Sequence, residues 1–178
     1  TPLVPVFAAQ ANPKDPVFRS TLVKATRVAA LAAVSATLAI LAGTPVMSVI
    51  VLGQISADLI ALTTALTAGW SVNVIVVPIY FAAQAIGVLR WNFLSHLLIA
   101  FFVLFGAFVL VPNFGSFGLV LAIITGLFGG MLVVLFGNAR ALQITDLARE
   151  LNWPIICASI AIVILCLAVG FLTTHLVG

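Results

Sequence analysis

Five long apolar runs, separated by short polar connections, dominate this chain. A helix needs about 20 apolar residues to cross a bilayer, and each run approaches or exceeds that length: 28–51, 58–86, 93–111, 117–137 and 154–176. The runs are continuous, whereas the strands of a membrane barrel alternate apolar and polar residues. With 64% apolar and 6% charged residues, the chain could not cover a soluble globule. The sequence predicts an all-α, polytopic transmembrane helical bundle of about five spanning helices plus amphipathic interfacial helices.

Positive charge is concentrated in three polar regions. Four of the seven Lys and Arg residues lie in 11–27, and the others are Arg90, Arg140 and Arg149. In a chain with five spans these regions fall on one side of the membrane, and the opposite connections carry no cation. Because cationic loops stay in the cytoplasm, we expect a cytoplasmic N-terminus and a C-terminus outside. The pI near 9.4 is thereby explained without a nucleic-acid partner.

The first 27 residues combine two short segments. "TPLVPVFAA" is too short and too rich in proline to span a bilayer, so it is interpreted as the end of a preceding helix, and the chain as part of something longer. Asp15 is expected to cap the next helix, with Pro16 in its first turn. The cationic face of that helix, with Lys24 and Arg27, predicts an interfacial helix on the anionic leaflet. A dedicated acidic-lipid site is the alternative.

These segments define the expected organisation of the chain. Residues 1–27 are the end of a preceding helix and a cytoplasmic basic interfacial helix, and residues 28–137 are a four-span bundle. Residues 138–153 form a cytoplasmic amphipathic connector, because leucines recur there at near-helical spacing among charged residues. Residues 154–178 supply the fifth span.

The span 58–86 carries the most informative polar pattern. Asn73, Tyr80 and Gln84 lie within about 40° of one another on a helix, and such a stripe is expected to face other helices or a water-filled cavity. Two interpretations fit equally: a substrate-binding stripe along a transport pathway, or hydrogen bonds that hold the bundle together. Gly69 and Pro78 predict a hinge in the same span.

Small residues recur at every fourth position of the span 117–137, at Gly118, Ala122, Gly126 and Gly130. On a helix these residues share one face, which lets another helix approach closely. The pattern predicts a packing seam. The functional alternative is that a smooth seam lets helices slide during transport.

No pattern indicates catalysis, a metal or a cofactor. His96 and His175 lie at opposite ends of their spans, about a membrane thickness apart, so they cannot ligate one haem. Cys157 and Cys166 point to opposite faces of a helix and are interpreted as buried apolar residues. Asp58 is expected to stabilise a helix N-terminus, and an ion site is the second interpretation. The sequence therefore predicts a protein that is not an enzyme, with no metal and no cofactor.

Four stretches resemble one family. "PLVPVFAAQANPKDPVFRSTLVKATR" resembles a segment in which a proline-terminated helix leads through a basic helix into the next span. "PVMSVIVLGQ" is similar to the close of that span, "YFAAQAIGVLRWN" to a basic turn, and "VPNFGSFGLVLAIITG" to a Gly-rich hairpin. Together they resemble part of the C-terminal lobe of multidrug/oligosaccharidyl-lipid/polysaccharide (MOP) flippases, closest to the O-antigen and polysaccharide exporters.

This resemblance implies flipping of a lipid-linked oligosaccharide, an undecaprenyl-diphosphate sugar, across the bacterial cytoplasmic (inner) membrane for polysaccharide or lipopolysaccharide O-antigen export. The partners implied are membrane lipids of the anionic leaflet, the lipid-linked saccharide, and an N-terminal lobe or other membrane subunits. The polar stripe of 58–86 would meet the sugar, and Arg27 and Arg90 would attract the headgroup at the cytoplasmic mouth. The chain departs from the family because no Lys or Arg lies deep within a span.

Two other functions stay open. A multidrug/cation antiporter on the same scaffold requires a carboxylate within the membrane, and no span carries one at its middle. The second is a non-transporting scaffold subunit of a larger membrane complex, a role that is compatible with spans that carry so little charge.

Overall fold

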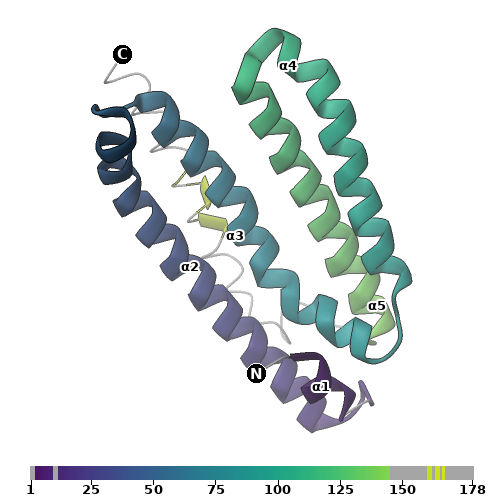
Figure 1. Cartoon of the computed structure of the whole chain (residues 1–178). Helices are drawn as coiled ribbons and strands as arrows, with labels where there is room; N and C mark the ends of the chain where they lie inside the picture. Colours follow the sequence, from purple (N-terminus) through teal and green to yellow (C-terminus); the bar gives the residue numbers. More distant parts are fainter. Residues whose placement is uncertain (1–2, 10–11, 145–159, 162, 165, 167–178) are drawn as a thin grey trace.

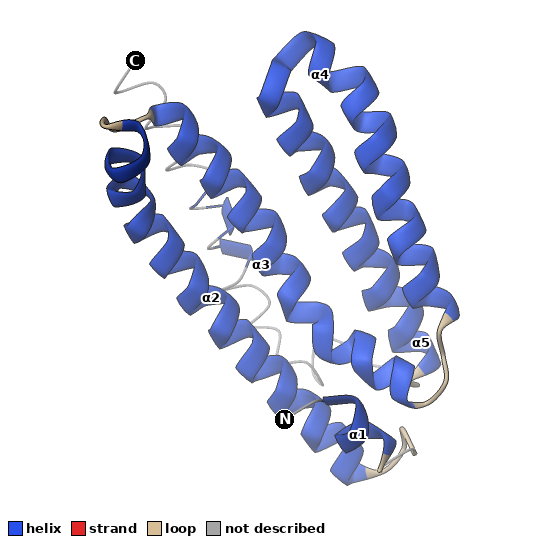
Figure 2. Cartoon of the chain, in the orientation of Figure 1, coloured by secondary structure: helices blue, strands red, loops and turns tan. Residues whose placement is uncertain are grey.

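The part of the chain that the computed structural model describes is helical and contains no strand (Figure 2). It comprises residues 3–9, 12–144, 160–161, 163–164 and 166. The helices are α1 (Leu3–Ala8), α2 (Pro16–Leu52), α3 (Ala57–Ala85), α4 (Arg90–Val133), the π-helix η1 (Val134–Asn138) and α5 (Ala139–Ala141).

Helix α2 begins and ends at residues that satisfy its free backbone groups. The Asp15 carboxylate accepts from the Val17 N–H at 2.8 Å, and Pro16 occupies the first turn, which confirms the predicted cap. At the other end Gly53 adopts φ 72° and donates its N–H to the Val49 carbonyl at 2.9 Å. Glycine adopts this left-handed conformation without the steric cost that a Cβ imposes.

The basic segment and the first predicted span form one helix of 37 residues. The sequence predicts an interfacial helix that leads into the span beginning at residue 28, and in the structure the two are continuous, with no break at Arg27 and Val28. The reason lies in the buried face, which continues through both parts with a spacing of three, four or seven residues. Its members are Phe18, Leu22, Thr26, Ala30, Ala33, Thr37, Thr44 and Ser48.

We expect the Asp15→Ala variant to lose about 1 kcal/mol of stability, because the Val17 N–H loses its acceptor. Asp15→Asn should retain nearly all of the stability, since an amide oxygen caps equally well. Thermal unfolding in detergent measures both. Equal losses in the two variants would show that the charge of Asp15, and not its capping bond, stabilises the helix.

Helix α3 is the central element, in contact with α1, α2, α4 and η1 (Figure 1). Its N-cap is Ser56, whose hydroxyl accepts from the Leu59 N–H at 3.3 Å. The connection from α2 is tied by Ser48, which donates to the Gln54 carbonyl and accepts from the Ser56 N–H, both at 2.8 Å.

Helix α4 folds back on itself at Gly115, which has φ 56° and ψ −136° (Figure 1). The arm before Gly115 and the arm after it run antiparallel. Position 118 lies against Leu110, position 122 against Gly106, position 126 against Ile99 and Val103, and position 130 against Ser95 and Ile99. The predicted spans 93–111 and 117–137 are these two arms.

The small residues of the second arm lie in this contact. Gly118, Ala122, Gly126 and Gly130 are all buried, and a Cβ built on Gly126 would sit 3.0 Å from the Ile99 carbonyl oxygen. The partner of this face is therefore the first arm of the same helix. Backbones approach this closely only where side chains are absent or minimal.

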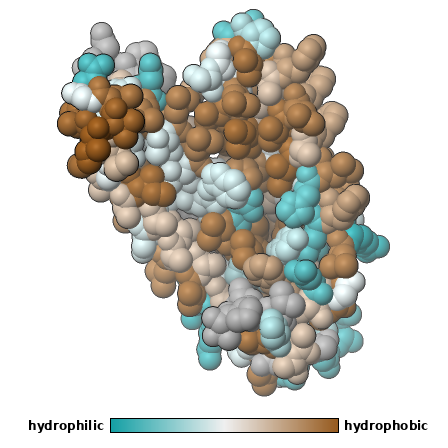
Figure 3. All heavy atoms as spheres, in the orientation of Figure 1, coloured by the Kyte–Doolittle hydropathy of each residue, from teal (hydrophilic) through white to brown (hydrophobic). Residues whose placement is uncertain are grey.

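Three helices of the described part are long and apolar enough to cross a membrane: Pro16–Leu52, Ala57–Ala85 and the continuous segment Arg90–Ala141. Five spans are not confirmed. Most of the predicted fifth span, 154–176, lies outside the described residues, as does 145–153 of the predicted connector. Large apolar side chains point outward along α2 and α4, and apolar residues cover most of the upper half of the face in Figure 3. These are the features of a helical membrane protein.

The largest buried cluster lies at the end where α1, α3 and α5 meet. Phe7 of α1 packs against Phe18 of α2, with 5.3 Å between ring centroids. Leu142 and Ile144, at the start of the predicted connector, are buried in the same cluster. Cys166 is buried in a second cluster, with Ala68 and Val72 of α3 and Val163, whereas Cys157 lies outside the described residues.

Candidate functional site

A cavity of about 350 Å³ lies between α3 and α4. We call it the α3–α4 cavity. Its polar lining comes from Asn73 and Tyr80 of α3 and from Ser95 and His96 of α4, and its apolar lining from Val76, Val77, Phe81, Ile99, Gly130 and Val134. Amide, phenol, hydroxyl and imidazole groups thus converge within an apolar protein, an arrangement typical of a ligand site.

The structure divides the predicted polar stripe. Asn73 and Tyr80 are half-buried and line the α3–α4 cavity, whereas Gln84 is exposed and does not. Gln84 stands in the last turn of α3, which ends at Ala85 before the chain turns into α4. The side chain is therefore not part of the cavity lining.

Tyr80 and His96 contact each other at the edge of the cavity. The Tyr80 hydroxyl lies 3.3 Å from His96 Nε2, and the two rings meet edge to face with centroids 5.7 Å apart. Both residues line the cavity. Sequence reasoning assigned His96 only to the membrane interface. The short connection between α3 and α4 could have indicated the role of His96. Two helices joined by a tight turn run antiparallel, so residues at equal distances from the turn, which is centred near position 88, lie opposite each other.

Beneath the cavity, buried side-chain amides form what we call the amide network. Asn92 Nδ2 donates to the Tyr80 carbonyl at 3.1 Å, and Asn138 Nδ2 donates to Asn92 Oδ1 at 2.6 Å. The Ser95 hydroxyl donates to the Asn92 carbonyl at 2.8 Å. Asn138 is 0% exposed, and its Oδ1 has no hydrogen-bond partner within the part of the chain that the structure describes. Buried polar groups in this position fix one arrangement of helices, because any other leaves them unpaired.

Asn138 belongs to the π-helix η1, which continues α4. A π-helical turn inserts an extra residue and re-aims the side chains after it, often at functional sites. Close packing fixes η1 in place, because a Cβ on Gly137 would overlap the indole ring of Trp91. The turn directs Asn138 onto Asn92 from a distant part of the sequence.

Gly69 and Pro78, the predicted hinge residues, lie on the buried side of α3. A Cβ on Gly69 would lie 3.3 Å from both Ile124 and Leu127, so this glycine permits close approach of the second arm of α4. Pro78 has no N–H to offer the Val74 carbonyl. The hinge stays a prediction.

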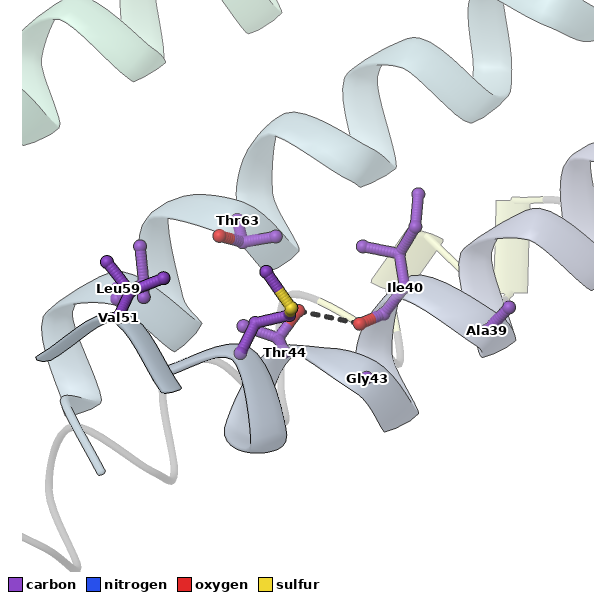
Figure 4. A pocket seen from close by; sticks show the side chains of 8 residues that line it. Ala39, Ile40, Gly43, Thr44, Val51, Leu59 and Thr63 are labelled. Atoms are coloured by element: carbon purple, nitrogen blue, oxygen red, sulfur yellow. Dashed lines mark hydrogen bonds between the residues drawn. The ribbon is translucent and has the colours of Figure 1, made fainter. Parts of the chain in front are cut away.

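A second hollow, the α2–α3 groove, consists of two cavities of about 570 Å³ and 590 Å³ that share Ile40 and Thr63. Figure 4 shows the first, where the Thr44 hydroxyl donates to the Ile40 carbonyl at 2.6 Å. In the second, Thr67 donates to the Thr63 carbonyl at 2.7 Å, and Thr37 to the Ala33 carbonyl. The Thr37 hydroxyl also contacts that of Ser71 across the two helices. These hydroxyls are satisfied internally, so the groove presents mainly apolar surface.

The described cations gather at the end of the bundle that holds the amide network (Figure 1). Arg19 donates to the Gln143 carbonyl at 3.4 Å, which ties the start of α2 to the chain after α5. Arg90 lies over the Trp91 ring at 5.0 Å. Neither Arg27 nor Arg90 lines the α3–α4 cavity. Arg149 lies outside the described residues, and Asp58 begins α3 at the opposite end.

No family model matches the chain, and neither does any curated protein or solved structure.

Proposed function

We propose that this protein takes part in moving a lipid-linked oligosaccharide, an undecaprenyl-diphosphate sugar, across the bacterial cytoplasmic membrane for polysaccharide or O-antigen export. The observation that carries the proposal is the α3–α4 cavity, in which Asn73, Tyr80, Ser95 and His96 converge inside an apolar helical protein. Sugars present neutral hydroxyl groups. A lining of neutral donors and acceptors beside aromatic rings suits them.

The chemistry of the lining favours a sugar over a cation. A cation antiporter requires a carboxylate in the membrane. The carboxylates of the described residues are Asp15 and Asp58, and both stand at the start of a helix, away from the cavity. We therefore place the antiporter second.

The distribution of cations supports the proposed orientation. Lys14, Arg19, Lys24, Arg27, Arg90 and Arg140 lie at one end of the bundle, which the positive-inside rule assigns to the cytoplasm. Arg27 and Arg90 would attract the diphosphate to this side. The sugar would then enter the α3–α4 cavity from the cytoplasmic leaflet.

Transport in liposomes tests the proposal. The full protein, extracted gently with any subunits that remain bound, is reconstituted with a fluorescent prenyl-diphosphate saccharide. We expect the Asn73→Leu/Tyr80→Phe variant to flip this lipid about tenfold or more slowly, because two polar contacts to the sugar are lost, each worth about 1 kcal/mol. Dithionite quenching of the outer leaflet measures the rate.

Asn113→Leu is the matched control, because Asn113 is exposed near the bend of α4 and, among the described residues, bonds within its own helix, to the Val109 carbonyl. Its flipping rate should equal that of the wild type. If the Asn73→Leu/Tyr80→Phe variant flipped the lipid at the same rate as the wild type, the sugar-binding role of the cavity would be refuted. A wild-type preparation that retains unrelated subunits and flips no lipid would favour a scaffold subunit.

A further inference from the structure

His96 gives the α3–α4 cavity a side chain that changes its charge with pH. The imidazole lines this cavity, and its Nε2 lies 3.3 Å from the Tyr80 hydroxyl. Imidazoles gain and lose a proton between about pH 5 and 8, whereas phenols keep theirs over that range. Tyr80 and His96 are the titratable residues in the described lining of the cavity, so a change of pH within this range acts there on His96.

Protons from the aqueous phase can reach the His96 ring. Six positions separate it from Arg90, the first residue of α4, which corresponds to about 9 Å along the helix axis. The residue is exposed, and it lies towards the end of the bundle where the described cations gather (Figure 1). Exchange with water at that membrane surface therefore sets its protonation state.

The described groups that surround the cavity are mostly neutral. α3 presents the Tyr80 phenol to His96. The second arm of α4 and η1 contribute Gly130 and Val134 to the lining, and neither carries a titratable group. Arg90, on the same helix as His96, does not line the cavity. Within the part of the chain that the structure describes, His96 is thus the residue through which pH changes the charge of the cavity.

Protonation reverses the hydrogen bond between His96 and Tyr80. When the neutral ring carries its proton on Nδ1, the bare Nε2 accepts from the Tyr80 hydroxyl, whose donor is then used within the protein. In the imidazolium both ring nitrogens donate. The Nε2–H group then bonds to the Tyr80 oxygen, and the phenol proton is free to point elsewhere. One added proton gives the cavity both a positive charge and a released O–H donor.

A positive charge beside free donors suits an anionic oxygen. Hydrogen bonds to ionised groups are about twice as strong as neutral ones, and apolar walls such as Val76 and Ile99 strengthen them further. In the same cavity, the Asn73 amide and the Ser95 hydroxyl suit uncharged hydroxyl groups. A ligand that joins a phosphate to a sugar therefore matches both parts of the lining.

We propose that protonated His96, together with the Tyr80 hydroxyl, binds the sugar-linked phosphate of the lipid-linked saccharide, so that the cavity holds this ligand more tightly at low pH. The inference rests on the proposed function, because the ligand is the one named there. It adds the residue that recognises the phosphate and the condition under which it does so. Because a charged hydrogen bond replaces a neutral one, the affinity rises about fivefold or more when His96 is protonated.

Calorimetric binding to the full protein in detergent, with any subunits that remain bound, tests the proposal at about pH 5.5 and about pH 8. One probe is a prenyl-diphosphate saccharide, and the other is a prenyl-linked saccharide that lacks the diphosphate. A diphosphate that is esterified at both ends keeps its charge over this range, so a pH dependence reports on the protein. We expect the first probe to bind at least about fivefold more tightly at the lower pH, and the second probe equally at both.

Three substitutions assign the effect to a residue. His96→Gln should abolish the difference between the two pH values, because an amide takes up no proton. His96→Lys keeps a positive charge at both values and should bind tightly at both, so a folding defect in the glutamine variant is recognisable. His175→Gln is the matched control, because it makes the same change at the other histidine of the chain. It should retain the pH dependence of the wild type.

The outcomes separate this inference from the proposed function. Equal affinities of the wild type for the first probe at the two pH values would overturn the role of His96 and leave the proposed function standing. Retention of the pH dependence in His96→Gln would do the same. If the wild type bound this probe at neither pH, the proposed function itself would be refuted.

A soluble analogue, in which a methyl group replaces the prenyl chain, distinguishes the lipid from a free anion. It should show the same preference for low pH but bind more weakly, because it lacks the chain that holds the ligand in the membrane. Binding as tight as that of the lipid would mean that the cavity takes soluble phosphate esters, and would refute the lipid-linked ligand.

Discussion

Replacing Gly118 by alanine is expected to lower the free energy of unfolding by about 1–3 kcal/mol. The added Cβ would lie 2.6 Å from the Leu110 carbonyl carbon and 2.9 Å from the Val111 nitrogen. Both are backbone atoms of the facing arm of α4, so no side-chain rotation can relieve the overlap. The two arms must separate, which also weakens the contacts at Gly126 and Gly130 further along the same face.

Gly43→Ala provides the matched comparison, because it makes the same chemical change inside a helix. A Cβ at Gly43 meets no atom of the described residues within 4 Å. Alanine there should stabilise α2 by about 0.5–1 kcal/mol, since it removes the backbone entropy of glycine. Thermal unfolding in one detergent measures both variants. Equal behaviour would contradict the antiparallel contact of the α4 arms.

The second large effect is expected at Asn92, the centre of the amide network. Asn92→Ala removes the acceptor of Asn138 Nδ2 and the side-chain donor to the Tyr80 carbonyl. Each buried polar group left without a partner costs about 1–3 kcal/mol. Because Tyr80 also lines the α3–α4 cavity, the rate of lipid flipping should fall together with the stability.

A double-mutant cycle with Asn138→Ala separates the pair from its surroundings. Once Asn92 is alanine, removing the Asn138 amide should cost little or even stabilise the protein, because an unpaired buried group disappears. We expect a coupling energy of about 0.5–3 kcal/mol from unfolding measurements. Additive losses would mean that the two amides act independently, and that the 2.6 Å contact contributes nothing.

Features that depend on neighbouring residues in the sequence were predictable. Asp15 followed by Pro16 identifies the start of α2, because the cap needs only the local backbone. The spacing of Gly118, Ala122, Gly126 and Gly130 identifies a closely packed face for the same reason. The apolar runs identify membrane helices by length alone.

Features that depend on which helices pair were not predictable. The small-residue face of the second arm of α4 could have packed against any helix. In the structure the chain reverses at Gly115, so this face packs against the first arm of α4. A helical projection places Gln84 with Tyr80, but only the structure shows that Gln84 is exposed in the last turn of α3 and does not line the cavity. The Asn92–Asn138 bond joins residues 46 positions apart, and the π-helical turn that aligns them has no local sequence signature.

The uninterrupted course of α2 has a mechanical consequence. At 1.5 Å per residue, the part of α2 before Pro45, from Pro16 to Thr44, measures about 44 Å, whereas the hydrocarbon core of a bilayer is about 30 Å thick. The helix must therefore tilt or project beyond the hydrocarbon. Because the helix is continuous at Arg27 and Val28, its basic start at the headgroup level and its apolar part within the lipid tilt together as one rigid body. A thinner bilayer increases the tilt and carries Lys24 and Arg27 sideways, so the thickness of the membrane sets the position of its lipid-facing charges.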